Sequence, residues 1–192
     1  MIENSYGQAY MKTMNIIRFK FSPKKAYAAL HWMVNEHPGI DLHGALKACY
    51  FADKDHLNAH QRPIFGATYR AMRFGPVPVE IYELAKGDPL WLAELGMDRL
   101  PWRLDGFRLV RSDNSVAEVD RSALSETDQT IFSSALARSV KMNFNERTAA
   151  THGRDWQAAE LGWMRYEDMI DDTAHKAETL DYLYENARFM RL

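Results

Sequence analysis

The block from Gly75 to Pro78 restricts the backbone more tightly than any other part of the chain. It reads Gly-Pro-Val-Pro, and each proline fixes its own φ and biases the preceding residue toward extended conformations. A chain tolerates this restriction only where a bend must take one shape. We therefore predict a rigid bend here. We expect a short helical turn over residues 68–74 before it, and after it a helix that starts near Pro78 and ends near Lys86.

The segments on both sides of this bend predict a mainly helical protein. Apolar residues recur at three- and four-residue spacing over 26–34, 42–57 and 132–140, which is typical of helices with one buried face. Ser22 and Asp41 stand where helix N-caps belong, and Ser125 followed by Asp128 resembles a capping box. The last periodic segment predicts one long helix over about 165–190.

One stretch between the helices has strand character. Alternating residues around Asp105-Gly106 predict a β-hairpin over 102–110, with a type I′ turn whose two central residues both have positive φ. A turn over 112–115 and the run 116–119 would add a third strand. The expected fold is mainly α with a small antiparallel β-hairpin or three-stranded meander, a helix-dominated α+β class. We expect residues 1–21 to form an N-terminal extension and residues 22–192 a single helical domain, with its β insertion near 101–120.

Length and composition fit one globular domain. A chain of 192 residues buries roughly 70% of its unfolded surface. The formal net charge of −2 argues against broad, charge-driven binding to nucleic acid, although a local basic patch is compatible with it. The single cysteine, Cys49, excludes an internal disulfide and a zinc site built from several cysteines. No apolar run reaches about 18 residues and no signal peptide is recognisable, so we expect a cytoplasmic protein with no membrane span.

Two histidines stand four residues apart, a spacing at which they can bind one metal ion. They are His56 and His60, and no HExxH pattern or third ligand at a defined spacing accompanies them. We therefore favour buried hydrogen bonds for Asp53 and His56. Lys47 precedes Asp53 by six residues and falls on another face of a helix. Arg62, folding back from the following turn, is the expected partner of Asp53 in a structural ion pair.

A second cluster of polar residues contains the residue types of a nucleophile and a base. It comprises Thr151 and His152, followed by Asp155 and Trp156. Nothing resembling an activated-serine elbow surrounds it, and the chain has no phosphate-binding glycine loop. We favour the interpretation that Thr151 and His152 end a helix and that Trp156 packs beneath it. Cys49 lies on an apolar helix face and is expected to be an inert core thiol. The sequence thus predicts no enzyme, no metal and no cofactor.

Residues 69–74 mix aromatic, thioether and guanidinium groups just before the rigid bend. Such groups are favoured at protein interfaces and can also stack on nucleic-acid bases. Alternatively, Tyr69 and Met72 belong to the core and the arginines are solvated. The sequence leaves interface and core equally open.

Considered together, the order and spacing of these segments resemble the SocA-like Panacea domain, also known as the phage-associated GepA-type domain. The resemblance spans roughly residues 24–170, from the helix that carries Leu46-Lys47 to a second signature at Thr151-His152 and Trp156. It marks candidate structural or interface residues, namely Lys47, Tyr50, Asp53, His56, Arg62, Pro63, Tyr69, Met72, Gly75, Pro76, Val77, Pro78, His152 and Trp156.

Members of this family are mostly antitoxins of toxin–antitoxin pairs. The resemblance implies that the chain neutralises a cognate protein toxin by direct binding, and it suggests a further role as an adaptor for a ClpXP-type protease. The alternative is a nucleic-acid-binding transcriptional regulator of its own operon, in which the hairpin acts as a wing. The near-neutral charge and the lack of a separate helix-turn-helix segment make nucleic acid the less favoured partner. The sequence leaves the oligomeric state open.

Overall fold

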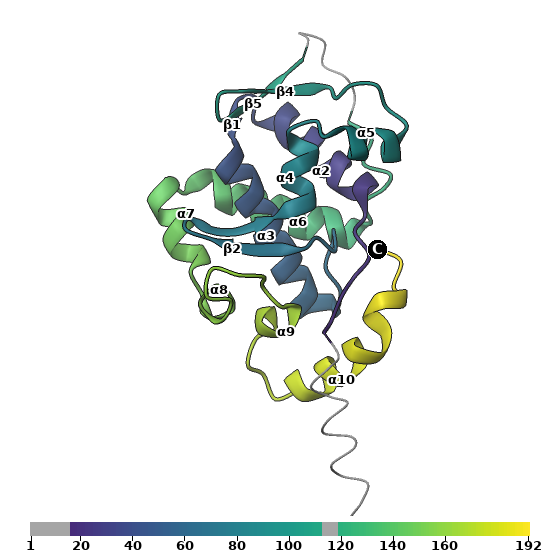
Figure 1. Ribbon diagram of the computed structural model, residues 1–192, viewed down its shortest axis with the longest axis vertical. Coiled ribbons are helices and arrows are strands. Elements are labelled where there is room, and N and C mark those ends of the chain that lie inside the picture. The colour runs from purple at the N-terminus through teal and green to yellow at the C-terminus, as the bar shows by residue number, and fades with distance from the viewer. Residues whose placement is uncertain (1–15, 113–118) are drawn as a thin grey trace, which may run out of the picture.

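A computed structural model describes residues 16–112 and 119–192, and most of them are helical (Figure 1). The helices are α2 (Pro23–Glu36), α3 (Leu42–His60), α4 (Val79–Ala85), α5 (Pro89–Leu95), α6 (Glu126–Lys141), α7 (Phe144–Thr151), α8 (Arg154–Ala158), α9 (Tyr166–Met169), α10 (Lys176–Asn186) and the 3₁₀ helix η1 (Ala187–Phe189). The strands are β1 (Ile40–Asp41), β2 (Tyr69–Met72), β3 (Gly75–Pro78), β4 (Trp102–Asp105) and β5 (Arg108–Arg111). None of the described helices combines the length and apolarity needed to cross a membrane.

The predicted helical turn over 68–74 is wrong, because these residues form strand β2 and the turn that follows it. β2 pairs antiparallel with β3, so the Gly-Pro-Val-Pro block is itself a strand. The Val79 amide donates to the Thr68 carbonyl at 2.9 Å, which makes 75, 77 and 79 the hydrogen-bonded positions of the ladder. Pro76 and Pro78 fall between them, and their missing N–H groups therefore cost the hairpin no hydrogen bond.

The second sheet confirms the predicted hairpin but shifts its turn. β4 and β5 pair with Asp105 opposite Arg108, so the central turn residues are Gly106 and Phe107. Of these two, Gly106 alone has positive φ, at 58°, a pattern typical of type II′ and not of type I′. The third strand is β1, which pairs with β5. The strand predicted over 116–119 falls largely on residues 113–118, outside the described part of the chain.

The structure confirms most of the predicted helix starts. The helix predicted near the C-terminus is wrong. The Asp41 carboxylate accepts the Gly44 amide at 2.7 Å at the start of α3, and Ser125 with Asp128 forms the predicted capping box of α6. The single long helix expected over 165–190 is instead α9, α10 and η1. The break follows Ile170, at an Asp-Asp-Thr sequence of residues that favour turns over helix interiors. The class is a helix-dominated α+β fold, as predicted.

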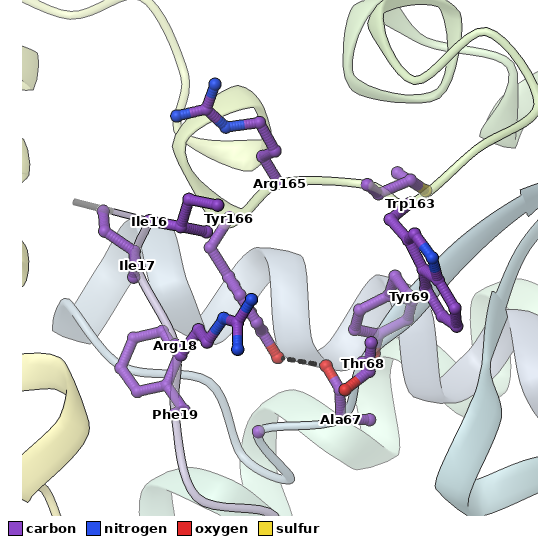
Figure 2. Close-up of a pocket in the computed structure, with 12 residues that line it drawn as sticks. Ile16, Ile17, Arg18, Phe19, Ala67, Thr68, Tyr69, Trp163, Arg165 and Tyr166 are labelled. Carbon is purple, nitrogen blue, oxygen red and sulfur yellow. Dashed lines mark hydrogen bonds between the residues drawn. The ribbon is translucent and has the colours of Figure 1, made fainter. Parts of the chain in front are cut away.

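The described part of the N-terminal segment, residues 16–21, packs against the C-terminal third of the chain. Ile17 is buried, and its amide donates to the Glu167 carboxylate at 3.1 Å. Phe19 meets Tyr166 edge-on, with ring centroids 4.8 Å apart, and the Tyr166 hydroxyl donates to the Ala67 carbonyl at 2.7 Å (Figure 2). This segment therefore forms one wall of the packed domain, although the sequence predicts it as an extension.

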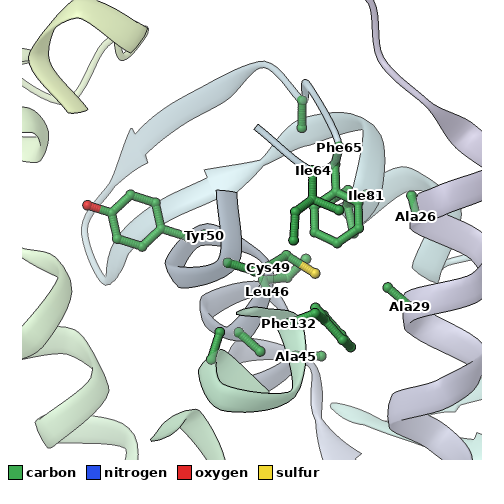
Figure 3. Packing of buried hydrophobic residues seen from close by; sticks show 14 of the residues in the cluster. Ala26, Ala29, Ala45, Leu46, Cys49, Tyr50, Ile64, Phe65, Ile81 and Phe132 are labelled. Carbon is green, nitrogen blue, oxygen red and sulfur yellow. The ribbon is translucent and has the colours of Figure 1, made fainter. Parts of the chain in front are cut away.

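The core lies around α3, which packs along α6 and against β3 and α7 (Figure 1). Small side chains, including Ala45, Ala48 and Cys49, line the buried side of α3, and each is fully buried. They leave room for larger groups, and Figure 3 shows Phe132 of α6 and Ile81 of α4 in this region. The interaxial distance between helices depends on the side chains at the contact, and small ones allow close approach.

Candidate functional site

Helix α3 buries a polar side chain at every third position from Lys47 to His56. Lys47 and Tyr50 are 1% and 2% exposed, and Asp53 and His56 are fully buried. Each of the four meets a different segment of the chain. Buried polar groups need hydrogen-bond partners, so these contacts determine what packs around α3.

Lys47 holds strand β3. Its Nζ donates to the Pro76 carbonyl at 2.7 Å. Burial, together with the positive charge of Arg147, lowers the pKa of Lys47 from 10.5 to about 7. Gly75 adjoins this contact with φ +98°, and a Cβ there would lie 2.4 Å from Thr151 Oγ1 and 3.0 Å from Lys47 Cε. Only glycine therefore fits between α3 and α7 at this position.

Tyr50 joins α3 to α8 through the buried carboxylate of Asp155. The Tyr50 hydroxyl makes a short hydrogen bond to Asp155 Oδ2, and Lys54 Nζ donates to the same oxygen at 3.0 Å. Burial and the negative charge of Asp155 both raise the pKa of Tyr50. Sequence reasoning did not pair these residues, which are 105 positions apart.

The second signature lies against the β2–β3 hairpin. As predicted, α7 ends at Thr151 and His152 is its C-cap. The His152 and Trp156 rings stack at 3.7 Å, and Trp156 Nε1 donates to the Met72 carbonyl at 2.9 Å. The second signature thus packs against the same β2–β3 hairpin that Lys47 of α3 contacts.

Asp53 binds backbone and not Arg62, so the predicted Arg62–Asp53 ion pair is wrong. Asp53 Oδ1 accepts the Ile64 and Phe65 amides, each at 2.8 Å, and Oδ2 accepts the Tyr69 hydroxyl at 3.0 Å. Pro63 carries no amide hydrogen, and the next two amides turn toward the carboxylate. Burial raises the pKa of Asp53 to about 6, although these hydrogen bonds lower it in part.

Arg62 instead meets Asp128, a fully buried carboxylate at the start of α6. Asp128 accepts Lys25 Nζ at 2.6 Å, Arg62 at 2.9 Å and the Ser125 amide at 3.0 Å. His56 Nε2 lies 3.1 Å from Asp128 Oδ1, within ion-pair distance. Burial opposes the charge on Asp128, but the contacts from His56, Lys25 and Ser125 hold its pKa well below the usual range.

The possible metal site at His56 and His60 finds no third ligand. His56 Nδ1 lies 2.8 Å from the Arg62 carbonyl, so both of its ring nitrogens already face protein groups. Within residues 16–112 and 119–192, no three His, Cys, Asp or Glu side chains lie close enough to hold a metal ion. Cys49 is buried, and burial raises the pKa of its thiol, as an inert core cysteine requires.

Arg147 of α7 anchors the other end of α3. Its Nη2 donates to both carboxylate oxygens of Asp41, at 2.9 and 2.8 Å, and its Nε donates to His43 Nδ1 at 3.3 Å. His43 Nε2 lies 3.1 Å from the Phe74 carbonyl. Burial and the charge of Lys47 lower the pKa of His43 to about 4, so this imidazole is neutral at pH 7.

Above this buried network lies a surface that we call the hairpin-tip patch, formed by Met72, Arg73, Phe74 and Phe144. The three apolar members are 46%, 47% and 42% exposed. The Phe74 and Phe144 rings meet with centroids 5.2 Å apart, and the Arg73 guanidinium lies 5.3 Å from the Phe74 centroid. The sequence leaves open whether Tyr69 and Met72 belong to the core or to an interface. In the structure Tyr69 belongs to the core and Met72 to the surface.

Comparison with known proteins identifies the same region. The family described as antitoxin SocA-like, Panacea domain matches residues 46–157. This span begins one residue before Lys47 and ends one residue after Trp156, so it contains both signatures and the hairpin between them. In comparisons with curated proteins and with solved structures, nothing matches the chain.

Proposed function

This chain belongs to the antitoxin SocA-like, Panacea domain family, and we propose that it neutralises a cognate protein toxin by binding it directly. The observation that carries the proposal is the hairpin-tip patch. It places three large, half-exposed apolar side chains and an arginine together within the residues that the family shares. Exposed apolar patches mark interaction sites, and aromatic, Met and Arg side chains are enriched in protein interfaces.

The buried network beneath the patch supports the same function. Lys47 and Trp156 bind the carbonyls of Pro76 and Met72, one on each strand of the hairpin, and His43 binds that of Phe74 in the turn. These contacts hold the hairpin in one position relative to α3 and α8. A surface that is rigid before binding loses less conformational freedom when it binds, which strengthens association.

The test is co-expression with the product of the adjacent reading frame. We expect the neighbour to be toxic alone and harmless beside the wild-type chain. Phe74→Asp should abolish protection with only a small fall in melting temperature, because the side chain is 47% exposed. Phe107→Asp is the matched control, since Phe107 is 84% exposed on the turn of the other hairpin, and it should protect fully.

Three results would contradict the proposal. The neighbour could be harmless, or its toxicity could persist beside the wild-type chain. Alternatively, retention of the operon's own promoter DNA by the purified chain at about 0.15 M salt, without neutralisation, would favour a transcriptional regulator, because binding that survives this salt exceeds non-specific phosphate contact.

Delivery of the bound toxin to a ClpXP-type protease is a further step of the proposal that rests on the family resemblance alone. It predicts that the toxin's half-life in cells shortens when the antitoxin is present and recovers when the protease is deleted. An equal half-life in both strains would restrict the function to direct binding.

A further inference from the structure

A pocket of about 390 Å³ lies beside the N-terminal segment, and we call it the N-terminal pocket (Figure 2). Its walls are residues 16–19, residues 66–69 and residues 163–166. The first and last of these lie outside the span 46–157 that the family shares. Its volume falls within the range of preformed binding sites. Within the described residues, the hairpin-tip patch and this pocket are thus two separate surfaces, one shared with the family and one built mainly by this chain's flanks.

The pocket combines apolar walls with one unpaired cation. Ile17, Phe19 and Tyr166 form the apolar side, and the Trp163 indole is 60% exposed at the rim. Figure 2 shows the Arg18 side chain extending into the pocket beside Tyr166. No carboxylate within residues 16–112 and 119–192 pairs with Arg18.

The other charged side chain that lines the pocket, Arg165, already has a partner. Arg165 contacts Glu167 at 3.1 Å, and Glu80 accepts the Thr68 amide at 2.7 Å. The Arg70 guanidinium lies 5.7 Å from the Trp163 ring centroid. A ligand that supplies a carboxylate to Arg18 therefore complements this pocket.

The backbone beside the pocket lies outside regular secondary structure. Ile17 and Ser22 hold the segment at its two ends, through Glu167 and the Phe65 carbonyl. Between them, Arg18, Phe19 and Lys20 form no backbone–backbone hydrogen bond with any part of the chain that the structure describes. An extended segment with free N–H and C=O groups is a template for adding a strand from another chain.

We propose that the N-terminal pocket binds an extended acidic–apolar segment of the cognate toxin, and thereby determines which toxin the chain recognises. The segment pairs with the backbone of residues 18–20, places an apolar side chain between Ile17 and Trp163, and directs a carboxylate to Arg18. This inference rests on the proposed function and adds to it a second contact. Nucleic acid fits less well, because it requires a row of free cations along its phosphates. Two arginines line the pocket, and one of them, Arg165, is paired with Glu167.

The test measures binding of the purified full-length chain to the purified product of the adjacent reading frame by isothermal titration calorimetry. Arg18→Glu reverses the unpaired charge, and Thr68→Trp fills the pocket from an exposed position. Each should weaken binding at least tenfold without lowering the melting temperature. Arg103→Glu is the charge-matched control, because Arg103 is 60% exposed on β4 at the opposite end of the molecule (Figure 1), and it should bind as tightly as the wild type.

Overlapping 12-residue peptides of the same toxin locate the segment. We expect one acidic–apolar peptide to bind the wild-type chain. Replacing its acidic residue by Arg should abolish binding to the wild type and restore binding to Arg18→Glu. This charge exchange is a readout that a general loss of structure does not reproduce.

The outcomes separate this inference from the proposed function. Wild-type affinity in both pocket variants would overturn the pocket proposal and leave neutralisation through the hairpin-tip patch intact. A wild-type chain that neither binds nor neutralises the neighbour would overturn both. If Arg18→Glu loses self-association in sedimentation, or loses promoter-DNA binding, while toxin affinity is unchanged, the occupant is a second copy or nucleic acid and the proposal is wrong.

Discussion

Lys47 is a buried lysine whose ammonium group binds a carbonyl oxygen. Its Nζ donates to Pro76, the nearby guanidinium of Arg147 repels its charge, and only 1% of the residue is exposed. Desolvation therefore disfavours the charged form. A carboxylate partner would stabilise the ammonium group, but the described carboxylates around α3 serve Tyr50, Arg62 and Arg147 instead.

This arrangement predicts a rise of stability with pH. In the unfolded chain Lys47 keeps its proton up to about pH 10.5, whereas in the folded chain its pKa is about 7. Between these values unfolding takes up a proton, so the free energy of unfolding increases with pH, by up to about 1.4 kcal/mol per unit. From pH 7.5 to 8.5, urea denaturation should show the wild type gaining about 1 kcal/mol more than Lys47→Met. Parallel curves for the two proteins would show that Lys47 keeps its proton in the fold.

At the scale of elements, the β2–β3 hairpin meets two helices, α3 and α7, at Gly75. Strand β3 passes between Lys47 of α3 and Thr151 of α7 so closely that a Cβ at Gly75 would meet both side chains. The prolines on either side of Val77 keep the strand extended along this path. The position of the hairpin-tip patch thus depends on a backbone approach and not on side-chain packing alone.

Gly75→Ala should therefore cost more stability than the same substitution at Gly39. Both glycines have positive φ, +98° and +82°, but a Cβ at Gly39 meets nothing within 4 Å. Each substitution carries the left-handed penalty of about 1–2 kcal/mol, and overpacking adds about 1–3 kcal/mol at Gly75. Chemical denaturation of the two variants measures the difference. Equal losses would mean that α7 can move away from the hairpin at little cost.

Across the whole molecule, segments from opposite ends of the chain share one core. The extended residues 16–22 lie against α9 and the loop that carries Phe65, so the N-terminal and C-terminal parts stabilise each other. The sequence pattern places a domain boundary near residue 21, because this segment has no helical periodicity of its own. Its burial instead predicts that the segment is a part of the cooperative unit.

Two adjacent isoleucines test this prediction. Ile17 is 3% exposed and Ile16 is 52% exposed. If residues 16–21 fold with the domain, Ile17→Ala should lower the free energy of unfolding by about 2–4 kcal/mol, as truncations of buried aliphatic side chains do. Ile16→Ala should change it by less than about 0.5 kcal/mol. Similar, small effects of both would identify a detachable extension.

Much of the local structure could be predicted from the sequence. Asp41 and Ser125 mark helix starts by local backbone chemistry, and the structure confirms both. The failures share one cause, which is a partner distant in sequence. Residues 69–72 form a strand because β3 and Trp163 lie beside them. Arg62 turns to Asp128 because two backbone amides already satisfy Asp53.

The amino-acid sequence by itself determined most of the helix starts, where the chain is rigid and which family it resembles, because caps, prolines and periodicity act over a few residues. The tertiary structure decided which buried charges meet. Asp128 and Asp155 lie 103 and 105 positions from Lys25 and Tyr50, and no local spacing connects them. It also decided that the hairpin tip is exposed and that the N-terminal segment forms a pocket wall, because exposure depends on how the elements pack.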